Sequence, residues 1–397
     1  MVVVMTNWRL SAVEVLVVLI AASAFATASS VAADSPDGVA RALDRIRAHD
    51  FHPLDADRFT IDRVLNQQGI ADLDNTDWKV RLLAVRDLVR AGKDAVPRIA
   101  QGLSDPNVHV RYVCAVALGV LKAAAASDDL ERVVREDADA LARSQAVVAL
   151  GQIESADSLD LLREHLEKDP SRDVRHQCEL AIDQIQKKMG ATDELRAAFR
   201  TLDPATFETV RIGAPAPDFT LPDTAGQAWR LGHFKGKNWV VLVWVFADWC
   251  PVCHGEFREL IEMRAEFEQV GVKVVTIEAH DRYRARVMVG RELDPKYWFA
   301  KTSFKETYTR RIWWPHLLDR AGTIGAIYGV DPMAFSVHAE YINRPATIIV
   351  DPVGNVRFAY HGTYWGDRPS IKQTLDMIRA ERFDFEHPQR RQAALPK

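Results

Sequence analysis

A 32-residue repeat organises the first half of the chain. Three ten-residue segments align without gaps at 110–119, 142–151 and 174–183, and each has an arginine in its second position. An aspartate stands six residues before each arginine. The arginines are Arg111, Arg143 and Arg175, and the aspartates are Asp105, Asp137 and Asp169. An internal period of this length predicts stacked helix pairs, because one pair cannot bury its apolar face alone.

An earlier copy extends the pattern toward the N-terminus. It begins at Val80, with Arg81 as its arginine and Asn75 in place of the aspartate. The pattern resembles short HEAT-like repeats, and this resemblance implies an all-α solenoid over 75–190. We expect the Asp and Arg side chains to tie neighbouring repeats together at helix starts, where a carboxylate also meets the helix dipole. Second helices are expected between the copies, at 95–103, 127–135 and 158–167.

Two of the four cysteines occupy the same repeat position. Cys114 and Cys178 lie two repeats apart, and stacked helices are spaced by roughly 8–10 Å. The two sulfurs are therefore expected to lie beyond disulfide reach and to be buried as small apolar groups. Because the repeats carry no catalytic pattern, we expect them to bind a protein partner; a passive spacer is the alternative.

The second half carries the other two cysteines. The β-branched run Val240–Phe246 predicts a buried parallel strand, and Cys250-Pro251-Val252-Cys253 follows it at once. Residues 256–270 have helical periodicity, so the motif lies where a strand turns into a helix. Free N–H groups and the dipole at a helix N-terminus stabilise a thiolate, which makes Cys250 the expected nucleophile. Further strands are expected at 272–279, 346–350 and 356–360, and a last helix at 371–380.

This order of elements resembles the thioredoxin fold. Residues 214–223 (APAPDFTLPD), the pair Trp249–Cys250, Glu256 and residues 344–356 (RPATIIVDPVGNV) are similar to the redoxin branch of that fold. The branch holds exported TlpA/ResA-type thiol–disulfide reductases and the AhpC/TSA peroxiredoxins. The resemblance implies an α/β thioredoxin-like domain at 211–385, behind the HEAT-like repeats.

The resemblance also implies roles for individual residues. Cys250 would attack a client disulfide and Cys253 would resolve the mixed disulfide. Glu256 would relay protons to Cys253, unless it is only a solvated helix carboxylate. The expected redox group is the Cys250–Cys253 disulfide itself, with no bound cofactor and no metal.

Substrate contacts are implied for three residues, Trp249, Arg344 and Pro345. Pro345 matches a proline that is cis in this family and lies against the two cysteines. In that position it would leave the backbone of Arg344 free to pair with an extended substrate.

A thiol peroxidase is the alternative that uses the same cysteines. A peroxiredoxin-like site would have Thr three residues before the reactive cysteine, where this chain has Ala247. It would also have Arg six residues before Asp351, where this chain has Pro345 and Arg344 is one place off. Both departures favour a disulfide reductase.

Two other functions fit parts of the same half. Residues Cys250–His254 match C-x-x-C-H, the attachment pattern of c-type haem. The buried strand that leads into the motif argues against the mostly helical surround of such a haem. The chain would instead be an interaction scaffold if its redoxin domain were vestigial, but the intact cysteine pair and Pro345 argue against that.

The N-terminus predicts export. Arg9 precedes an apolar run over 13–28, and small residues at 30–33 fit a cleavage site. We expect a signal peptide at 1–33, or an uncleaved membrane anchor, and therefore a periplasmic or otherwise extracytoplasmic protein. A reductase there would need electrons from a membrane donor or a thioredoxin-type reductant, and its partner would be a disulfide-containing protein client.

The remaining boundaries follow from these assignments. We expect a helical segment at 34–74, a closing helix and linker over 191–210, and a C-terminal tail at 386–397. Residues 282–311 carry nine Lys or Arg against three Asp or Glu, and form either a lid beside the site or an inserted helix pair. A net charge of −4 over the whole chain argues against a nucleic-acid partner.

Overall fold

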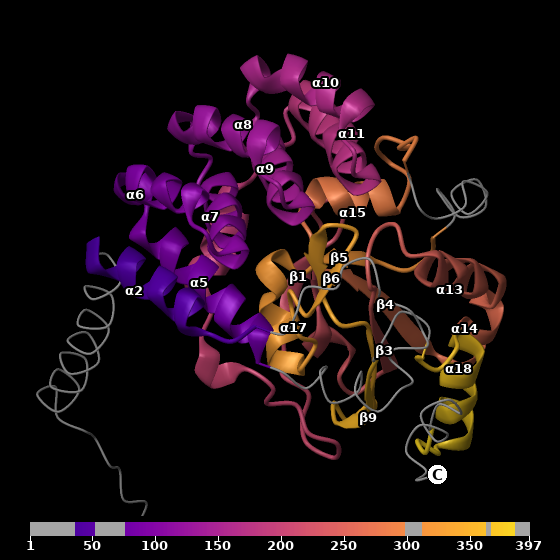
Figure 1. Ribbon diagram of the computed structural model, residues 1–397. Helices are drawn as coiled ribbons and strands as arrows, with labels where there is room; N and C mark the ends of the chain where they lie inside the picture. The colour runs from indigo at the N-terminus through magenta and orange to yellow at the C-terminus, as the bar shows by residue number, and fades with distance from the viewer. Residues whose placement is uncertain (1–35, 52–75, 298–311, 363–366, 386–397) are drawn as a thin grey trace, which may run out of the picture.

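The computed structural model describes residues 36–51, 76–297, 312–362 and 367–385. A stack of helices is followed by an α/β domain (Figure 1), which confirms the predicted fold class. The expected signal peptide, most of the segment at 34–74 and the tail at 386–397 lie outside the described residues. Within the described ranges, no helix is both long and apolar enough to cross a membrane.

The stack contains the helix pairs that the repeat predicts. Its inner helices follow the aligned segments, and its outer helices match the three ranges expected between them to within two residues at either end. The helices are α2 (Pro36–Ala48), α5 (Asp77–Ala91), α6 (Val96–Gln101), α7 (Val108–Val120), α8 (Ser127–Glu136), α9 (Ala140–Ile153), α10 (Leu159–Lys168) and α11 (Arg172–Lys187). The expected closing helix is α12 (Asp193–Thr201), which packs against α5.

The aspartate–arginine ladder ties each repeat to the next. Arg111 donates two hydrogen bonds to Asp137, at 2.7 and 2.9 Å, and Arg143 donates two to Asp169, at 3.1 and 3.0 Å. Each arginine therefore reaches the aspartate of the following repeat, while its Nη1 donates to a backbone carbonyl of its own repeat. Each aspartate also accepts a backbone N–H at the start of the following helix. The predicted ladder is confirmed.

The first rung departs from the sequence pattern. Asp105 is paired with Arg47 of α2, at 2.8 and 2.9 Å, and not with the arginine of the earlier copy. That arginine, Arg81, donates instead to the carbonyl of Met333 in the α/β domain, at 2.6 Å. The N-terminal repeat is thus adapted to contact the second domain.

Two glycines set the spacing of the inner helices. A Cβ atom on Gly119 would lie 3.0 Å from Cα of Ala149, and one on Gly151 would lie 3.2 Å from Cα of Ala181. A side chain at either position would push α7 from α9, or α9 from α11. At the third repeat the equivalent residue is Asp183, which accepts a hydrogen bond from Tyr283 of the α/β domain at 2.9 Å. The glycine is thus replaced by an aspartate in the last repeat, where the neighbouring element belongs to the α/β domain and not to another repeat.

The α/β domain is built on a five-stranded sheet of order β5–β4–β3–β8–β9. β3, β4 and β5 are parallel, while β8 runs antiparallel to β3 and β9 antiparallel to β8. The strands are β1 (Thr220–Pro222), β2 (Ala228–Arg230), β3 (Trp239–Trp244), β4 (Val272–Glu278), β5 (His316–Leu318), β6 (Phe335–Val337), β7 (Glu340–Ile342), β8 (Ala346–Val350) and β9 (Val356–His361). The helices are α13 (Pro251–Glu262), α14 (Arg264–Val270), α15 (Arg282–Met288), α17 (Thr323–Tyr328) and α18 (Ile371–Ala380).

Alternate residues of β3 divide the core into two halves. Val241 and Val243 pack with apolar residues of α13 and α18, whereas Leu242 and Trp244 pack with those of β1 and α17. Both faces of the central strand are therefore buried, as its continuous apolar run predicts. Burial continues beyond β3 through Cys250, so the cysteine motif begins inside the core.

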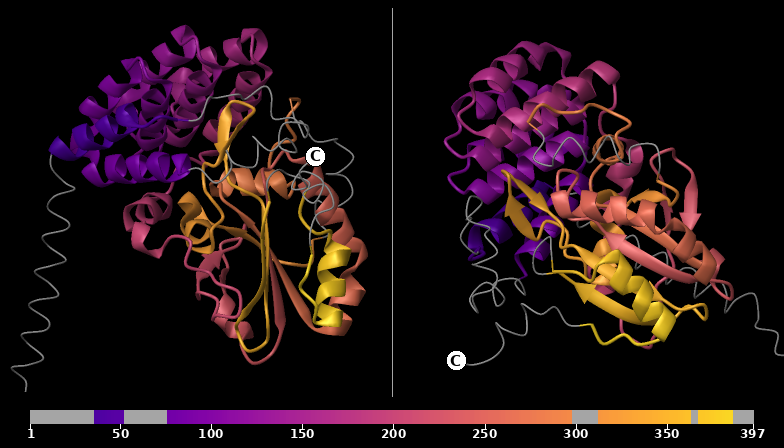
Figure 2. Two further views of the ribbon diagram at one scale, coloured as in Figure 1. Left: turned by 60° about the horizontal axis from the view of Figure 1, so that its bottom comes forward. Right: turned by 90° about the vertical axis from the view of Figure 1, so that its right-hand side faces the viewer.

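The helical stack lies directly against the α/β domain, as the two views in Figure 2 show. The β6–β7 hairpin carries much of the contact. Its Tyr341 lies under the Arg81 guanidinium, 4.0 Å from the ring centroid. The Tyr341 hydroxyl is 3.1 Å from Nδ1 of His109 on α7. The inner face of the repeats is thus occupied by the chain's own second domain.

The buried rung of the ladder provides a test of its role in stability. Removing the carboxylate in Asp169→Ala leaves the buried Arg143 charge unpaired, and we expect a loss of about 3–5 kcal/mol in the free energy of unfolding. The control Asp160→Ala removes an exposed pair with Arg163 and should cost at most about 1 kcal/mol. Urea unfolding followed by far-ultraviolet circular dichroism measures both, and equal losses would contradict a structural role for the ladder.

Candidate active site

The two cysteines lie where β3 turns into α13. Cys250 is the N-cap residue of α13, with φ −68° and ψ 117°, and Pro251 takes the first helical position. A proline is favourable there because its missing N–H would have no helical partner. Cys253 follows one turn later, and both side chains are fully buried. The predicted place of the motif is confirmed.

The two sulfurs differ in their hydrogen bonds. Sγ of Cys250 accepts the backbone N–H of Cys253 at 3.4 Å. Sγ of Cys253 accepts the backbone N–H of Phe246 at 3.3 Å and lies 3.6 Å from Nη2 of Arg368. Only Cys253 is therefore in contact with a full positive charge among the described residues.

Arg368 is the functional residue that the sequence analysis missed. It lies between β9 and α18, is buried, and donates to Oε2 of Glu256 at 2.6 Å. Its other terminal nitrogen donates to the carbonyl of Trp244 at the end of β3, at 2.5 Å. In the sequence, residues 361–368 (HGTYWGDR) resemble a redoxin C-terminal loop, but this resemblance specifies no contact for Arg368.

These contacts decide which sulfur is the thiolate. Burial raises the pKa of both thiols, but at Cys253 the hydrogen bond from Cys250 and the Arg368 charge outweigh it and bring the pKa to about 6. Burial and the proton that it shares with Cys253 hold the pKa of Cys250 well above its ordinary value. The helix-terminus argument placed the thiolate on Cys250. In the closed, reduced pair the structure instead favours a thiolate on Cys253, because that sulfur accepts a hydrogen bond from Cys250 and lies 3.6 Å from Nη2 of Arg368.

Glu256 is buried beside this pair and is not a solvated carboxylate. Burial raises its pKa to about 8, although Arg368 acts in the opposite direction. Glu256 is therefore mostly protonated at neutral pH, which suits a residue that donates a proton.

The three expected substrate contacts are engaged within the protein. The indole N–H of Trp249 donates to Oε1 of Glu340 at 2.6 Å. The Arg344 side chain is paired with Asp331 at 2.8 Å, and its backbone N–H donates to the carbonyl of Asp331 at 3.2 Å. Trp249 and Arg344 are both buried. A backbone N–H of Arg344 that is free to pair with a substrate was therefore the wrong expectation for this conformation.

Pro345 also differs from the expectation. It precedes β8, and its carbonyl accepts the N–H of Gly362 at 2.7 Å. The described residues contain no cis peptide bond, so the bond before Pro345 is trans.

A buried ionic network joins the cysteine loop to the helical repeats. Arg284 of α15 donates two hydrogen bonds to Asp248 and two to Glu340, and a fifth to Oε1 of Gln177 on α11. Burial raises the pKa of Asp248, but the charge of Arg284 and its hydrogen bonds outweigh this and lower the pKa to about 2. Asp248 and Trp249 directly precede Cys250, so the network fixes the loop that presents the cysteine.

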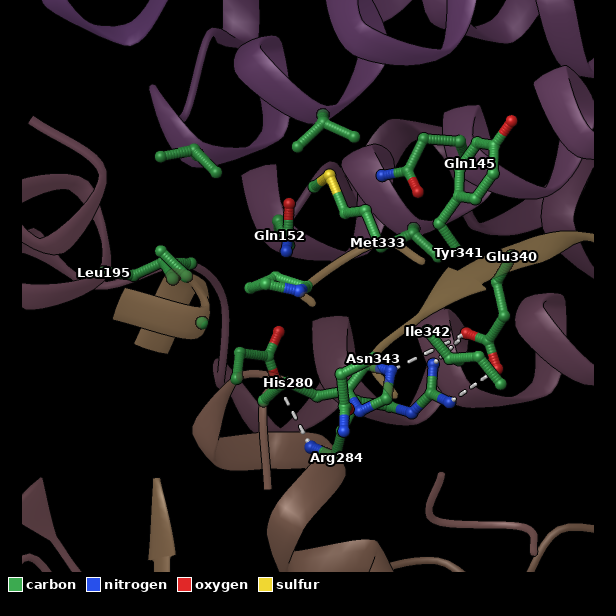
Figure 3. A pocket seen from close by; sticks show the side chains of 18 of the residues that line it. Gln145, Gln152, Leu195, His280, Arg284, Met333, Glu340, Tyr341, Ile342 and Asn343 are labelled. Atoms are coloured by element: carbon green, nitrogen blue, oxygen red, sulfur yellow. Dashed lines mark hydrogen bonds and ion pairs between the residues drawn. The ribbon is translucent and has the colours of Figure 1, made fainter. Parts of the chain in front are cut away.

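A cavity of about 140 Å³ lies between the two domains next to this network (Figure 3). On its redoxin side, Figure 3 shows His280, Arg284 and Asn343; on the helical side lie Gln152 and Leu195. The Glu278 carboxylate outweighs the effect of burial on His280 and raises the pKa of that imidazole to about 9. The cavity is separated from the cysteines by the Arg284 network and does not open onto them.

His254 bears on the haem alternative. Its side chain is fully buried, and Nε2 lies 2.8 Å from the backbone carbonyl of Asp248. The nitrogen that would ligate haem iron is therefore engaged in the cysteine loop. In the described ranges, no group of three or more His, Cys, Asp or Glu side chains is arranged to hold a metal ion.

The region expected as a lid or helix pair forms part of the interface. Its described part contains α15, whose Arg284 carries the network, while residues 298–311 lie outside the described residues. Lys296 and Tyr297 donate their backbone N–H groups to Glu179 of α11, at 2.8 and 3.2 Å. This insertion therefore joins the two domains.

Comparisons with known proteins agree with both halves of the chain. Residues 212–359 match the model of the AhpC/TSA family, and residues 70–151 and 136–183 match the model of HEAT repeats. The thiol-disulfide oxidoreductase ResA of Geobacillus thermodenitrificans is 28% identical over 170 residues, which cover 43% of this chain and 79% of ResA.

Two further relatives are named for different activities. Alkyl hydroperoxide reductase E of Mycobacterium tuberculosis is 31% identical over 150 residues, covering 38% of this chain and 84% of that protein. The thiol:disulfide interchange protein DsbE of Allochromatium vinosum is 33% identical over 144 residues, covering 36% of this chain and 70% of that protein. All three alignments cover less than half of this chain.

The fold and the paired cysteines define a thioredoxin-like redox enzyme with an N-terminal helical repeat region. Through its C-terminal domain, the chain belongs to the AhpC/TSA family. The preceding residues are HEAT repeats, and the predicted resemblances are confirmed at this level.

Access to Cys250 tests the role of the Arg284 network. Arg284→Met leaves Asp248 and Glu340 buried without their cation, so opening of the interface should cost less by about 3–5 kcal/mol. We expect native-state labelling of Cys250 by a maleimide to accelerate by about a hundredfold or more. Mass spectrometry of tryptic peptides measures the rate at each cysteine.

Two controls separate local opening from unfolding. Arg286→Met, on the same helix, removes a partly buried pair with Glu292, whose carboxylate keeps its pair with Lys187, and should leave labelling unchanged. Cys114, in the core of the repeats, should stay slow in both variants. Equal labelling of Cys250 in the two variants would show that the network does not hold the site closed.

Proposed function

We propose that this protein is an exported thiol–disulfide oxidoreductase that reduces disulfides of protein clients through Cys250 and Cys253. The observation that carries the proposal is the hydrogen-bonded cysteine pair at the start of α13, with a buried cation on one sulfur. A thiolate and a thiol in contact are the reduced half of a disulfide couple. Similarity to ResA and DsbE supports the same chemistry.

The proposed reaction transfers two electrons to the client. Cys250 passes its thiol proton to the Cys253 thiolate and attacks one sulfur of the client disulfide. A mixed disulfide forms, and one client sulfur leaves as a thiol after taking the proton of Glu256. Cys253 then attacks the Cys250 sulfur and gives up its proton to the second client sulfur, which leaves as a thiol, so that the Cys250–Cys253 disulfide remains. A membrane donor or a thioredoxin-type reductant must return two electrons and two protons.

The helical repeats have a different place in this proposal from the one that the sequence suggested. Their inner face already binds the redoxin domain, so a protein partner would dock on the remaining surface or displace that contact. Because both sulfurs are buried, a client reaches Cys250 only after the elements over the site move apart. The repeats would therefore help to select the client.

Export completes the proposal. It rests on the N-terminal apolar run, whose structure lies outside the described residues. A periplasmic or otherwise extracytoplasmic site, with the signal cleaved or retained as an anchor, suits disulfide chemistry because structural disulfides persist in oxidising compartments.

Peroxide reduction is the second candidate, and two observations favour it. Alkyl hydroperoxide reductase E is among the relatives, and Arg368 lies beside a cysteine as a thiolate-stabilising cation. Arg344, near the position that a peroxiredoxin-like site would use, is instead paired with Asp331. That pairing, and Ala247 in place of Thr, support the reductase.

Trapping of the mixed disulfide tests the proposal. Cys253→Ser should accumulate a covalent adduct between Cys250 and a disulfide-containing protein such as insulin, seen on non-reducing gels. Cys250→Ser should form no adduct and should lower insulin reduction to background. The control Cys114→Ser, in the repeat core, should keep both activities.

A hydroperoxide assay on the unsubstituted protein separates the alternatives. Faster turnover with hydroperoxide than with insulin would replace the reductase by the peroxidase. Turnover with neither substrate, in a protein that folds normally, would favour an interaction scaffold with a vestigial redoxin domain.

A further inference from the structure

Arg368 has three contacts that together close one side of the cysteine pair. Nη2 lies 3.6 Å from Sγ of Cys253 and donates to Glu256 at 2.6 Å, while Nη1 donates to the Trp244 carbonyl at 2.5 Å. The last contact anchors the guanidinium to the end of β3. The side chain is almost completely buried, so water does not compensate its charge.

Arg368 carries one positive charge but faces two groups that can each become negative. It faces two acids, the Cys253 thiol and the Glu256 carboxyl, and both are buried. A second buried anion without its own cation carries a large desolvation cost. A single guanidinium therefore compensates one anion at a time.

The other titratable groups near the pair do not change this count. Cys250 is neutral while Cys253 holds the thiolate, because the two sulfurs share one proton. Glu259 also faces Glu256 from α13, but its carboxylate accepts the backbone N–H groups of Ile371 and Lys372 at the start of α18. As an additional anion, Glu259 favours the protonated form of Glu256.

We propose that Arg368 is a further catalytic residue, which holds one negative charge that moves between Cys253 and Glu256 with the redox state. In the reduced protein the charge lies on Cys253 and Glu256 is protonated. In the disulfide form Cys253 is neutral, so Glu256 ionises and pairs with Arg368. This inference rests on the proposed thiol–disulfide exchange.

The atoms and electrons of the exchange balance on this scheme. The reduced site holds two transferable protons, one on Cys250 and one on Glu256, together with the Cys253 thiolate. The client disulfide gains two electrons from the cysteine pair and both protons, and leaves as two thiols. The oxidised site holds the Cys250–Cys253 disulfide and the Glu256 carboxylate. The site, including Arg368, is neutral before and after the reaction.

The pH dependence of the reduction potential tests the scheme directly. Between the pKa of Cys253 near 6 and that of Glu256 near 8, we expect two protons to be taken up per two electrons. In Glu256→Gln only the proton on Cys250 remains, so the slope of potential against pH should fall by half. An unchanged slope would overturn the proposal, because two ordinary thiols take up two protons in either protein.

Infrared difference spectra locate the second proton. Reduction by dithiothreitol should produce the carbonyl band of a protonated carboxylic acid, and Glu256→Gln should lack it. If the band appears equally in both proteins, another carboxyl takes up the proton and the scheme is wrong.

The arginine itself is tested by thiolate absorbance of the reduced protein. Arg368→Met should move the thiolate transition from near pH 6 to above neutral pH, whereas Arg368→Lys should restore part of the shift. Arg379→Met on α18 removes an exposed pair with Glu266 of α14; it is the matched control and should titrate like the unsubstituted protein. Circular dichroism confirms that each variant is folded. A low-pH transition that persists in Arg368→Met would overturn the assignment.

These readouts separate the inference from the proposed function. The titrations need only reduced and oxidised protein and no client. A protein that shows the halved slope but reduces no client disulfide would keep the charge scheme and lose the proposed activity. A protein that reduces insulin with an unchanged slope would do the reverse.

Discussion

The five hydrogen bonds of Arg284 hold the cysteine loop, the β6–β7 hairpin and the helical repeats together. One guanidinium joins the cysteine loop through Asp248, the β6–β7 hairpin through Glu340, and the helical repeats through Gln177. All of its N–H donors are used, so the charge is fully compensated. The position of Cys250 therefore depends on three segments that are far apart in the sequence. The helical repeats take part in forming the active site and are more than an appended docking module.

The sequence predicted those features that repeat or alternate. A 32-residue period specifies the helix pairs and the ladder, because stacked repeats contact only their neighbours and the same contact recurs. The central strand and the helix that begins at Cys250 follow from an apolar run and a capping position. These are local rules, and they hold for the α/β domain as well as for the repeats.

Contacts between distant segments were beyond the sequence. Arg368 lies 115 positions after Cys253, and no period or motif connects the two. Arg81 leaves the ladder for the carbonyl of Met333 in the second domain, and Arg47 of α2 takes its place on Asp105. The thiolate was assigned to Cys250 by a local argument, and a buried charge from another segment reverses it. In each case a contact with a distant segment, and not the local sequence, determines the partner of the side chain.

The two buried arginines near the cysteines differ in whether the acids that they face change charge with the redox state. Arg284 faces two carboxylates, Asp248 and Glu340, and the nearby imidazole of His280 is itself paired with Glu278. These carboxylates cancel the charge of Arg284, which therefore contributes little positive field to the sulfurs. Arg368 has one charge for two acids, so any change at one acid must be answered at the other. This dependence couples the proton on Glu256 to the two electrons that the cysteine pair gains or loses. The side of the site that holds Arg368 is therefore the side that responds to oxidation.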